Sequence, residues 1–452
     1  MRYESQRVAY KYFTLAALLF GLQVIFGLIN AAQYIWPGFL AGMLPFNIAR
    51  MIHLNLMVFW LLLGLMGGVY YLASDEAGAE LFSPALANFQ FWLLAATGVG
   101  AVAGFLFFGY SEGREYLEAP RVFDWLIVVG ALTFLFNVLF TFTRGRKWSP
   151  VSGVLFGGLA GLSVLYLFGM VFLKSLAVDM YVWWWVIHLW VEGTWELIAA
   201  AITAYLLIRL TGIDRKIIEK WLYIEVGLVL LTGILGTGHH YYWIGTPEYW
   251  LWIGGIFSAL EPLPILLMVF DTLRHVRESQ SPHPNKVALY WVVGGAISHF
   301  IGAGVMGFIQ TLPQINKWTH GTQFTPAHGH LAFFGAYGML VLAIIYFALP
   351  ELRRVTEFDQ RRSIRVFWTL SVSMLAMSVI LLGAGMVQVY LERMLGIDFM
   401  TVKNQYFPLW MALRGLAGVA FTVGVAWFLG DYFTLGVAAR REEPVGKPAA
   451  QA

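Results

Sequence analysis

A succession of long apolar segments constrains this chain more than any other feature. Hydrophobic residues make up 59% of its 452 residues and charged residues 12%, with a mean hydropathy of +0.69. A water-soluble chain of this size does not bury so much apolar surface, whereas segments of ~20 apolar residues match the thickness of a bilayer. The sequence therefore predicts an all-α polytopic membrane protein, a bundle of twelve transmembrane helices at residues 10–34, 49–73, 88–110, 122–143, 151–174, 182–210, 219–244, 249–273, 287–313, 325–350, 362–391 and 407–436.

The organisation of the chain is correspondingly simple. Residues 1–436 form one transmembrane domain, and we expect the first apolar segment to be a transmembrane helix with no cleavable signal before it. Residues 437–452, rich in Arg, Glu, Pro and Ala, are predicted to be a solvated cytoplasmic tail. The sequence indicates no second domain.

Lys and Arg are concentrated in alternate connections. If the N-terminus is cytoplasmic, that side of the membrane receives 21 of the 29 basic residues, which is the distribution that sets membrane topology. Both termini are therefore predicted to be cytoplasmic. The net charge of +3 follows from the same asymmetry, and we expect no binding of nucleic acid.

The chain contains no cysteine. This excludes disulfides, iron–sulfur ligation and covalent attachment of heme through a Cys-x-x-Cys-His motif. Any heme must therefore be held non-covalently by His. Electrons, if the protein uses them, must come from another subunit or a soluble donor.

Six histidines are predicted to lie at one depth in the outer part of the membrane. His53 and His188 come early in segments that enter from outside, and His239 and His240 come late in a segment that runs outward. The remaining two come early in a segment that returns inward, at His328 and His330. Since segments from four distant parts of the chain would rarely agree by chance, we interpret the six as one functional cluster.

The spacing of His328 and His330 is informative by itself. Side chains two residues apart on a helix point to nearly opposite faces, so this segment can ligate two metals, as two hemes held back to back would require. The adjacent His239 and His240 diverge by ~100° on a helix. Both can reach one metal near a helix end, which Pro247 favours.

The other four histidines are not assigned to the site. We interpret His299, alone in its apolar segment, as a hydrogen-bonding group between helices. The rest fall in connections, where a solvated imidazole needs no further explanation: His275, His283 and His320.

Three acids inside apolar segments are candidates for the site. Glu192 and Glu196 follow His188 at i+4 and i+8, on one face of a helix, and Glu261 lies in the eighth segment. A carboxylate inside the bilayer costs about 2.5–3.5 kcal/mol on insertion scales, which favours a functional role. Glu192 is predicted to bind the same metal as His188, and Glu196 to carry protons or to support the ligands. The alternative for each is a protonated, structural hydrogen-bonding group.

This combination of residues resembles the heme-copper oxidase superfamily and, within it, the catalytic subunits of cytochrome c-dependent nitric oxide reductases, over essentially the whole chain. The resemblance implies that His53 and His330 are axial ligands of a low-spin heme b and that His328 is the proximal ligand of a high-spin heme b. It implies a non-heme metal held by His188, His239, His240 and Glu192.

The ligand set bears on which metal is bound. Copper oxidases of the superfamily carry a Tyr where this chain has Glu192, and a carboxylate beside three imidazoles suits iron better than copper. The resemblance then implies the reaction 2 NO + 2 e⁻ + 2 H⁺ → N₂O + H₂O, with Glu192, Glu196 and Glu261 at the catalytic centre.

The outer connection between the third and fourth segments carries Arg114, Glu115 and Glu118. In the resembling family this connection approaches the heme propionates, and its first Glu helps to bind a structural Ca²⁺. The resemblance implies that Glu115 binds Ca²⁺, with Glu118 beside it, and that Arg114 faces the propionates. The alternative is an ordinary solvated loop.

The resemblance also implies partners and a location. We expect a membrane-anchored cytochrome c subunit, which passes on electrons from a soluble periplasmic donor, and a place in the bacterial inner membrane with the active site toward the periplasm. The inner halves of the segments offer few ionisable groups besides Glu225. Protons are therefore expected from the outer side, with Glu115, Glu118, Glu192, Glu196 and Glu261 as candidate members of the route.

Three other functions match parts of this pattern. A cytochrome c-fed terminal oxygen reductase with a heme-copper centre would need its essential tyrosine elsewhere, at Tyr223, Tyr241 or Tyr242. A transporter could use intramembrane His and Glu as a proton or metal pathway, but it predicts no heme and no reason for six histidines at one depth. An inactive assembly relative would not need a complete ligand set.

Overall fold

The computed structural model describes residues 1–145, 148–259, 262–279, 285–355 and 357–436. Within these residues, eleven helical segments are long and apolar enough to cross a membrane, so the chain is a multi-pass membrane protein. The α-helices are α1 (Val8–Ile35), α2 (Phe46–Ala77), α3 (Pro84–Phe108), α4 (Arg121–Gly145), α5 (Pro150–Gly169), α6 (Leu176–Leu189), α7 (Trp195–Thr211), α8 (Arg215–Gly236), α9 (Glu248–Phe257), α10 (Leu263–Ser279), α11 (Lys286–His299), α12 (Phe308–Thr311), α13 (Pro313–Thr319), α14 (Phe324–Phe333), α15 (Met339–Leu352), α16 (Gln360–Gln388), α17 (Phe399–Thr401) and α18 (Phe407–Thr434).

The predicted all-α fold is confirmed, and the predicted count of twelve spans is approximately right. Where the sequence predicts one segment at 249–273, the structure has two shorter helices, α9 and α10. Pro262 directly precedes α10, and proline is tolerated at a helix start but interrupts a helix interior. Glu261 and His283, as well as the tail 437–452, lie outside the described residues.

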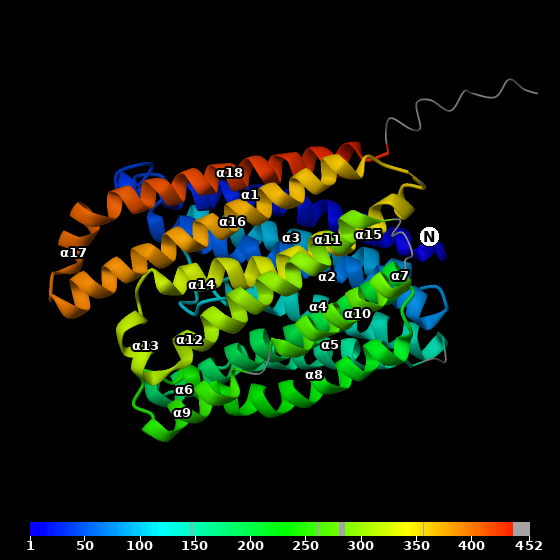
Figure 1. The fold of residues 1–452 in the computed structure, drawn as a ribbon, viewed down its shortest axis with the longest axis horizontal. Helices are drawn as coiled ribbons and strands as arrows, with labels where there is room; N and C mark the ends of the chain where they lie inside the picture. The colour runs from blue at the N-terminus through cyan, green and yellow to red at the C-terminus, as the bar shows by residue number, and fades with distance from the viewer. Residues whose placement is uncertain (146–147, 260–261, 280–284, 356, 437–452) are drawn as a thin grey trace, which may run out of the picture.

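The long helices run side by side along the molecule (Figure 1). The N-terminus lies at one end, near the ends of α7, α10 and α15, and α9, α13 and α17 lie at the other. Helices α2, α7 and α15 belong to the most buried spans and form the centre of the bundle.

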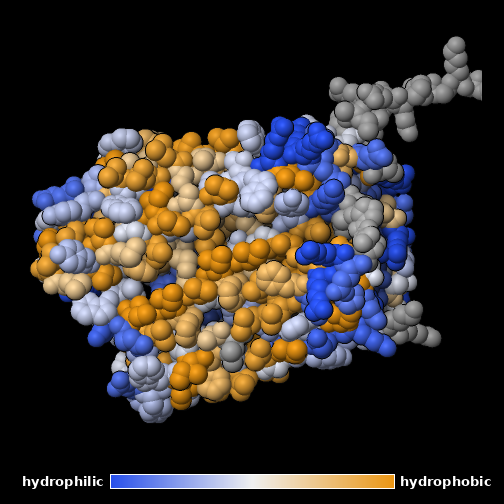
Figure 2. All heavy atoms as spheres, viewed as in Figure 1, coloured by the Kyte–Doolittle hydropathy of each residue, from blue (hydrophilic) through white to orange (hydrophobic). Residues whose placement is uncertain are grey.

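The surface agrees with a bundle that crosses a bilayer. Figure 2 shows hydrophobic side chains over the middle of the visible face and hydrophilic ones at the end that holds the N-terminus. At that end Arg209 lies 3.5 Å from Asp75, and Arg215 lies 2.7 Å from Glu76. This is the end that the Lys and Arg distribution predicts to be cytoplasmic.

Wider and tighter helical turns interrupt the helices at a few places. Wide turns of the π type cover η2 (Trp190–Thr194), η4 (Phe300–Gly307), η5 (Phe334–Gly338), η6 (Val389–Met394) and η7 (Val402–Tyr406). Tight 3₁₀ turns cover η1 (Glu4–Arg7) and η3 (Thr237–His240). Such irregular turns are frequent at functional sites because they redirect side chains that a regular helix would place elsewhere. Here η2 and η3 carry predicted metal ligands.

Candidate functional site

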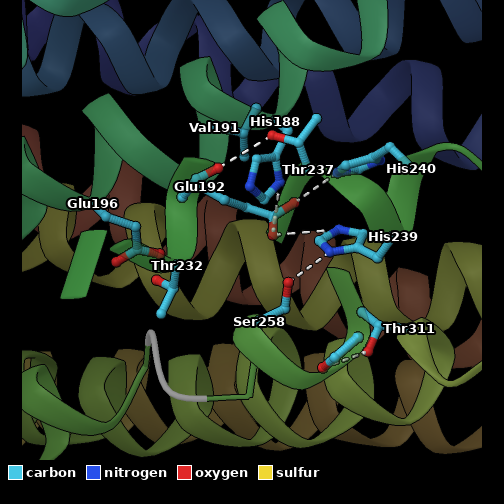
Figure 3. Close-up of polar contacts among 12 residues, drawn as sticks. His188, Val191, Glu192, Glu196, Thr232, Thr237, His239, His240, Ser258 and Thr311 are labelled. Atoms are coloured by element: carbon cyan, nitrogen blue, oxygen red, sulfur yellow. Dashed lines mark hydrogen bonds and ion pairs between the residues drawn. The ribbon is translucent and has the colours of Figure 1, made fainter. Parts of the chain in front are cut away.

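Four of the predicted metal ligands come together in one cluster. Their ligand atoms all lie within 4.8 Å of one another, and within the described residues no other such group of His, Cys, Asp and Glu is found. His188 lies at the end of α6 and Glu192 in η2, while His239 and His240 are the last residues of η3 (Figure 3). Segments that are distant in sequence thus meet at one point.

Glu192 lies among the three imidazoles. Its Oε2 is 3.4 Å from Nδ1 of His188 and 3.6 Å from Nε2 of His239, and its Oε1 is 3.1 Å from Nε2 of His240. Both ring nitrogens of the fully buried His188 lack a hydrogen-bond partner among the described residues. Since buried polar atoms are normally paired, these atoms fit a cation that binds three nitrogens and a carboxylate.

The local structure explains how two adjacent histidines reach one point. A 3₁₀ turn replaces the regular α-helical geometry at the end of α8, where the two histidines lie, and η2 turns Glu192 toward the same space. Nδ1 of His239 lies 2.6 Å from the hydroxyl of Ser258, and the ring of Trp184 stacks on that of His240. Both contacts orient the ligands, as the supporting groups of metal sites do.

Two glycines allow helix α9 to lie against this turn. A Cβ at Gly238 would lie 2.1 Å from the carbonyl oxygen of Trp250, and one at Gly254 would lie 2.1 Å from the backbone nitrogen of His239. Any side chain at either position would therefore separate α9 from the two histidines.

His53 and His330 face each other across a gap that fits one iron. Their ring centroids are 6.4 Å apart. Two metal–nitrogen bonds of about 2 Å, each extended by about 1 Å from the nitrogen to the ring centre, span a similar distance. Nδ1 of His53 donates to the carbonyl oxygen of Gln23 at 2.9 Å, and Nδ1 of His330 donates to that of Pro326 at 2.6 Å. Each Nε2 is thereby left as the ligand atom.

His328, on the other side of α14, is also oriented by a hydrogen bond from its ring to a backbone carbonyl. Its Nδ1 donates to the carbonyl oxygen of Gly302 in η4 at 2.8 Å, which leaves Nε2 available. The ring lies near enough to Glu192 and His239 to interact with them electrostatically. The structure thus places His330 beside His53, and His328 toward the four-residue cluster.

Glu196 lies on α7, one helical segment after Glu192. Its Oε1 is 2.9 Å from Nε2 of His299 and 3.5 Å from the hydroxyl of Tyr337, which also donates to the carbonyl oxygen of Val191 at 2.9 Å. Its Oε2 has no partner among the described residues. His299 joins α11 to α7, as predicted for a hydrogen-bonding group between helices, and this bond brings it next to the site.

The outer connection is more ordered than a solvated loop. Arg114 is buried and donates to the carbonyl oxygens of Gly169 and Val171 at 2.6 and 2.8 Å, and to Asp179 at 2.5 Å. Its guanidinium carbon also lies 3.8 Å from the ring centroid of Phe172. These contacts fix the connection to the ends of α5 and α6, and a contact of Arg114 with a propionate stays a prediction.

The two acids of the connection have different surroundings. Glu115 is partly exposed and pairs with Arg50. Glu118 is buried and accepts a hydrogen bond of 2.6 Å from Asn55. Burial raises the pKa of Glu118 to about 7, and Glu115 adds to the rise, whereas the Asn55 hydrogen bond and the charge of Arg50 oppose it.

Sequence reasoning missed three residues next to these sites. Ser258 and Tyr337 are polar groups inside apolar segments, and in sequence they carry no spacing signal. Arg414 on α18 was detectable, because it is a cation inside the last apolar segment. It acts electrostatically on His53 and His330, and it makes no ion pair with a described carboxylate.

Comparisons with known proteins extend over almost the whole chain. Residues 7–420 match the family model described as cytochrome c and quinol oxidase polypeptide I. The chain is 46% identical over 450 residues to the B subunit of the nitric oxide reductase of Stutzerimonas stutzeri, covering 95% of this chain and 94% of that protein. It is 22% identical over 478 residues to a cytochrome c oxidase subunit 1 homolog of Agrobacterium tumefaciens (strain T37), covering 97% and 85%.

A solved structure shows the same fold. A heme-copper terminal oxidase, determined as a dimer by cryo-electron microscopy, superimposes with a TM-score of 0.73 at 15% identity. The match covers 95% of this chain and 84% of that chain.

Proposed function

The chain belongs to the cytochrome c and quinol oxidase polypeptide I family, and on this basis we propose that it is the catalytic subunit of a nitric oxide reductase. The 46% identity to a nitric oxide reductase polypeptide over 95% of the chain supports this choice within the family. The observation that carries it is the carboxylate of Glu192 among three imidazoles. A hard oxygen ligand at this position suits iron, and an iron site suits the reduction of NO.

The residues present fit the expected cofactors. His53 and His330 would hold a low-spin heme b between them, and His328 would hold a high-spin heme b. The non-heme iron would be held by His188, His239, His240 and Glu192. When bound, the high-spin heme and the non-heme iron supply the redox chemistry that joins two NO molecules into N₂O.

The chain itself contributes positioning and protons. Backbone carbonyls fix the tautomers of His53, His328 and His330, while the hydroxyl of Ser258 orients the ring of His239. The reaction 2 NO + 2 e⁻ + 2 H⁺ → N₂O + H₂O consumes two protons. Glu196, hydrogen-bonded to His299 beside the cluster, is the group placed to pass them to the site. Glu261 stays a predicted member of this route.

Protons are proposed to enter from the outer side. Glu118 is buried next to Asn55, and Glu115 lies closer to solvent and pairs with Arg50. Calcium is less well supported than iron, because Ca²⁺ takes six to eight oxygen ligands and Glu115 supplies one carboxylate. The remaining ligands would have to come from Glu118, backbone carbonyls and propionates.

The partners follow from the activity. We propose that a membrane-anchored cytochrome c subunit docks on the outer face and receives electrons from a soluble periplasmic donor. The protein would lie in the bacterial inner membrane with both termini in the cytoplasm and the active site toward the periplasm. The concentration of basic residues in the connections predicted to be cytoplasmic supports this orientation.

The alternative, a cytochrome c-fed oxygen reductase, is less well supported. An oxygen reductase would need a tyrosine at its metal site, and the three candidate tyrosines make their contacts away from the four-residue cluster. Tyr242 donates to the carbonyl oxygen of Thr311 at 2.7 Å, Tyr241 packs on Tyr181, and the side chain of Tyr223 is 65% exposed. The transporter alternative does not account for the facing pair His53 and His330.

The activity is tested on the purified complex of both subunits. Reduced cytochrome c donor is supplied without oxygen, NO is added, and NO loss and N₂O formation are followed together. We expect one N₂O for every two NO, with slower consumption of oxygen under the same donor. Oxygen reduction without N₂O formation would instead support the terminal oxidase.

A further inference from the structure

A buried acid in the middle of the bundle takes no part in the ligand sets or the outer proton route. Glu225 lies on α8, ten residues after the first residue of that helix and thus ~15 Å along it. Its side chain is 1% exposed, and neither carboxyl oxygen has a hydrogen-bond partner among the described residues. An isolated carboxylate at this depth is costly, so an acid kept here calls for a functional explanation.

The neighbour of Glu225 is a second acid with an unpartnered carboxyl oxygen. Glu196 lies on the adjoining helix α7, near enough for the two carboxyl groups to interact electrostatically. The Oε1 atom of Glu196 is occupied by His299 and Tyr337, while its Oε2 is buried and unpartnered. Figure 3 shows Glu196 next to Thr232, which lies two turns further along α8 than Glu225.

The two carboxyl groups differ in how well they support a negative charge. Hydrogen bonds to a carboxylate stabilise its ionised form, and Glu196 has donors available whereas Glu225 has none among the described residues. Two ionised carboxylates side by side in a medium of low dielectric constant repel each other strongly. The pair is therefore expected to hold one proton, and to hold it on Glu225.

We propose that Glu225 is an internal proton donor that acts through Glu196, an inference that rests on the proposed function. Since the two carboxyl groups are not hydrogen-bonded to each other, the step needs one water molecule between them. The O–H bond of Glu225 breaks as this water accepts the proton, and the water gives one of its own protons to Oε2 of Glu196, where an O–H bond forms. The negative charge moves to Glu225, no electron is transferred, and the total proton number of the pair is unchanged. Glu196 then gives its proton to the site, and the pair regains one through Glu196 from the outer supply.

A proton on Glu225 is a reserve for the active site, and it lies close to Glu196, through which protons from the outer side arrive. NO reduction consumes two protons per turnover, and a route that delivers them one at a time would leave the second step waiting. The proton held on Glu225 moves to Glu196 when the consumption of protons at the site drives the transfer. A purely structural role for Glu225 as a polar contact between α7 and α8 predicts no change in its protonation when the enzyme turns over.

The test uses the complete complex with hemes loaded, and four variants of α8. Glu225→Gln keeps a polar group of the same shape without a transferable proton, and Glu225→Asp restores the proton. Glu225→Leu removes both. The matched control is Glu219→Gln, which removes a carboxyl group from the same helix at the end where Glu219 pairs with Arg215. Heme content and visible spectra establish that each variant is folded and loaded.

Two readouts are combined. The first is NO consumption, which we expect E225Q and E225L to slow by on the order of 10²-fold, E225D to restore largely and E219Q to leave unchanged. The second is the infrared difference spectrum between oxidised and reduced complex. It should contain the carbonyl band of a protonated carboxyl group that shifts in D₂O and is missing in E225Q.

The outcomes separate the proton store from the function on which it rests. If the wild type forms no N₂O, the proposed function fails, whatever the infrared spectrum shows. If the wild type reduces NO but E225Q, fully loaded, does so equally fast, Glu225 stores no proton. A slow E225Q that retains the band, or a wild-type spectrum without any such band, would equally overturn the inference.

Discussion

The imidazole rings of His53 and His330 face each other from α2 and α14 with their centroids 6.4 Å apart. Each ring donates through Nδ1 to a backbone carbonyl, so the two Nε2 atoms are the free ligand atoms. This arrangement fits two axial ligands of one iron. It is independent of the four-residue cluster, and the two sites can be disrupted separately.

Replacing His330 by Ala is therefore expected to remove the low-spin heme and to spare the high-spin one, since His328 lies on the other side of α14. The variant should lose about half of its b-type heme and the low-spin ferric signal in electron paramagnetic resonance. His320→Ala, in the connection before α14, is the control and should keep both. Retention of the full heme content in H330A would contradict the assignment.

Replacing Glu192 by Gln should weaken the non-heme metal site without loss of heme. Replacing a group that only supports a metal ligand typically lowers the metal affinity about 10–100-fold. Loss of a direct ligand should therefore lower the affinity for the non-heme metal by on the order of 10²-fold or more. Non-heme iron and NO reduction are measured together after dialysis. Glu248→Gln, an exposed acid at the start of α9, should change neither quantity.

Ser258 is expected to affect metal binding only through its contact with His239. Ser258→Ala removes the hydroxyl that lies 2.6 Å from Nδ1 of this ring and should lower affinity for the non-heme metal by about 10–100-fold. Increasing chelator concentrations measure the loss of iron. Thr133→Ala, whose hydroxyl bonds to the carbonyl oxygen of Val129 in its own helix, is the control. Equal retention of iron in S258A and T133A would show that Ser258 does not orient the ligand.

Arg414 is expected to raise the reduction potential of the low-spin heme. A positive charge near His53 and His330 favours the ferrous over the ferric state, since the latter carries one more positive charge. Arg414→Leu should therefore lower the potential while heme content stays constant. A redox titration followed in the visible bands measures it. An unchanged or higher potential would argue against a cation acting on this heme.

Glu118 should make stability depend on pH. Burial raises its pKa to about 7 in the folded protein, above the ordinary value of 4.5 that it recovers on unfolding. The folded state therefore holds a proton that the unfolded state releases between these values. The stabilisation is complete below pH 4.5 and is lost as pH rises through about 7.

The measurement compares the midpoint of thermal unfolding of the wild type and of Glu118→Gln at pH 5, 6, 7 and 8. The wild type should lose stability relative to E118Q as pH rises, and the difference should level off above about pH 7. Parallel curves would show that Glu118 ionises as it would in water.

Much of the fold was predictable because a bilayer imposes a fixed length on each helix. The prediction of one helix at 249–273 was wrong, because mean hydropathy over a segment does not register a single proline. Pro262 cannot continue a regular helix, and the structure has α9 and α10 on either side of it. The predicted depth of the histidines followed from topology alone, and the structure brings His188, His239 and His240 together.

The remaining features of the site depend on irregular turns of the backbone, which the regular spacing of residues along a helix does not predict. The stripe His188, Glu192 and Glu196 assumes a regular helix, but the wide turn η2 intervenes, and Glu196 contacts His299 rather than the cluster. Partners such as Ser258 and Tyr337 come from other helices, and their positions depend on packing. The burial of Arg114 against the ends of α5 and α6 has the same origin.

The central claim is that Glu192 and three histidines bind iron rather than copper. The most direct measurement is iron, copper and calcium in the purified complex, set against its b-type heme and any covalently bound heme. We expect about three irons for every two b-type hemes once covalent heme iron is subtracted, with no copper. One copper and no iron beyond the hemes would contradict the claim and assign the protein to the oxygen reductases.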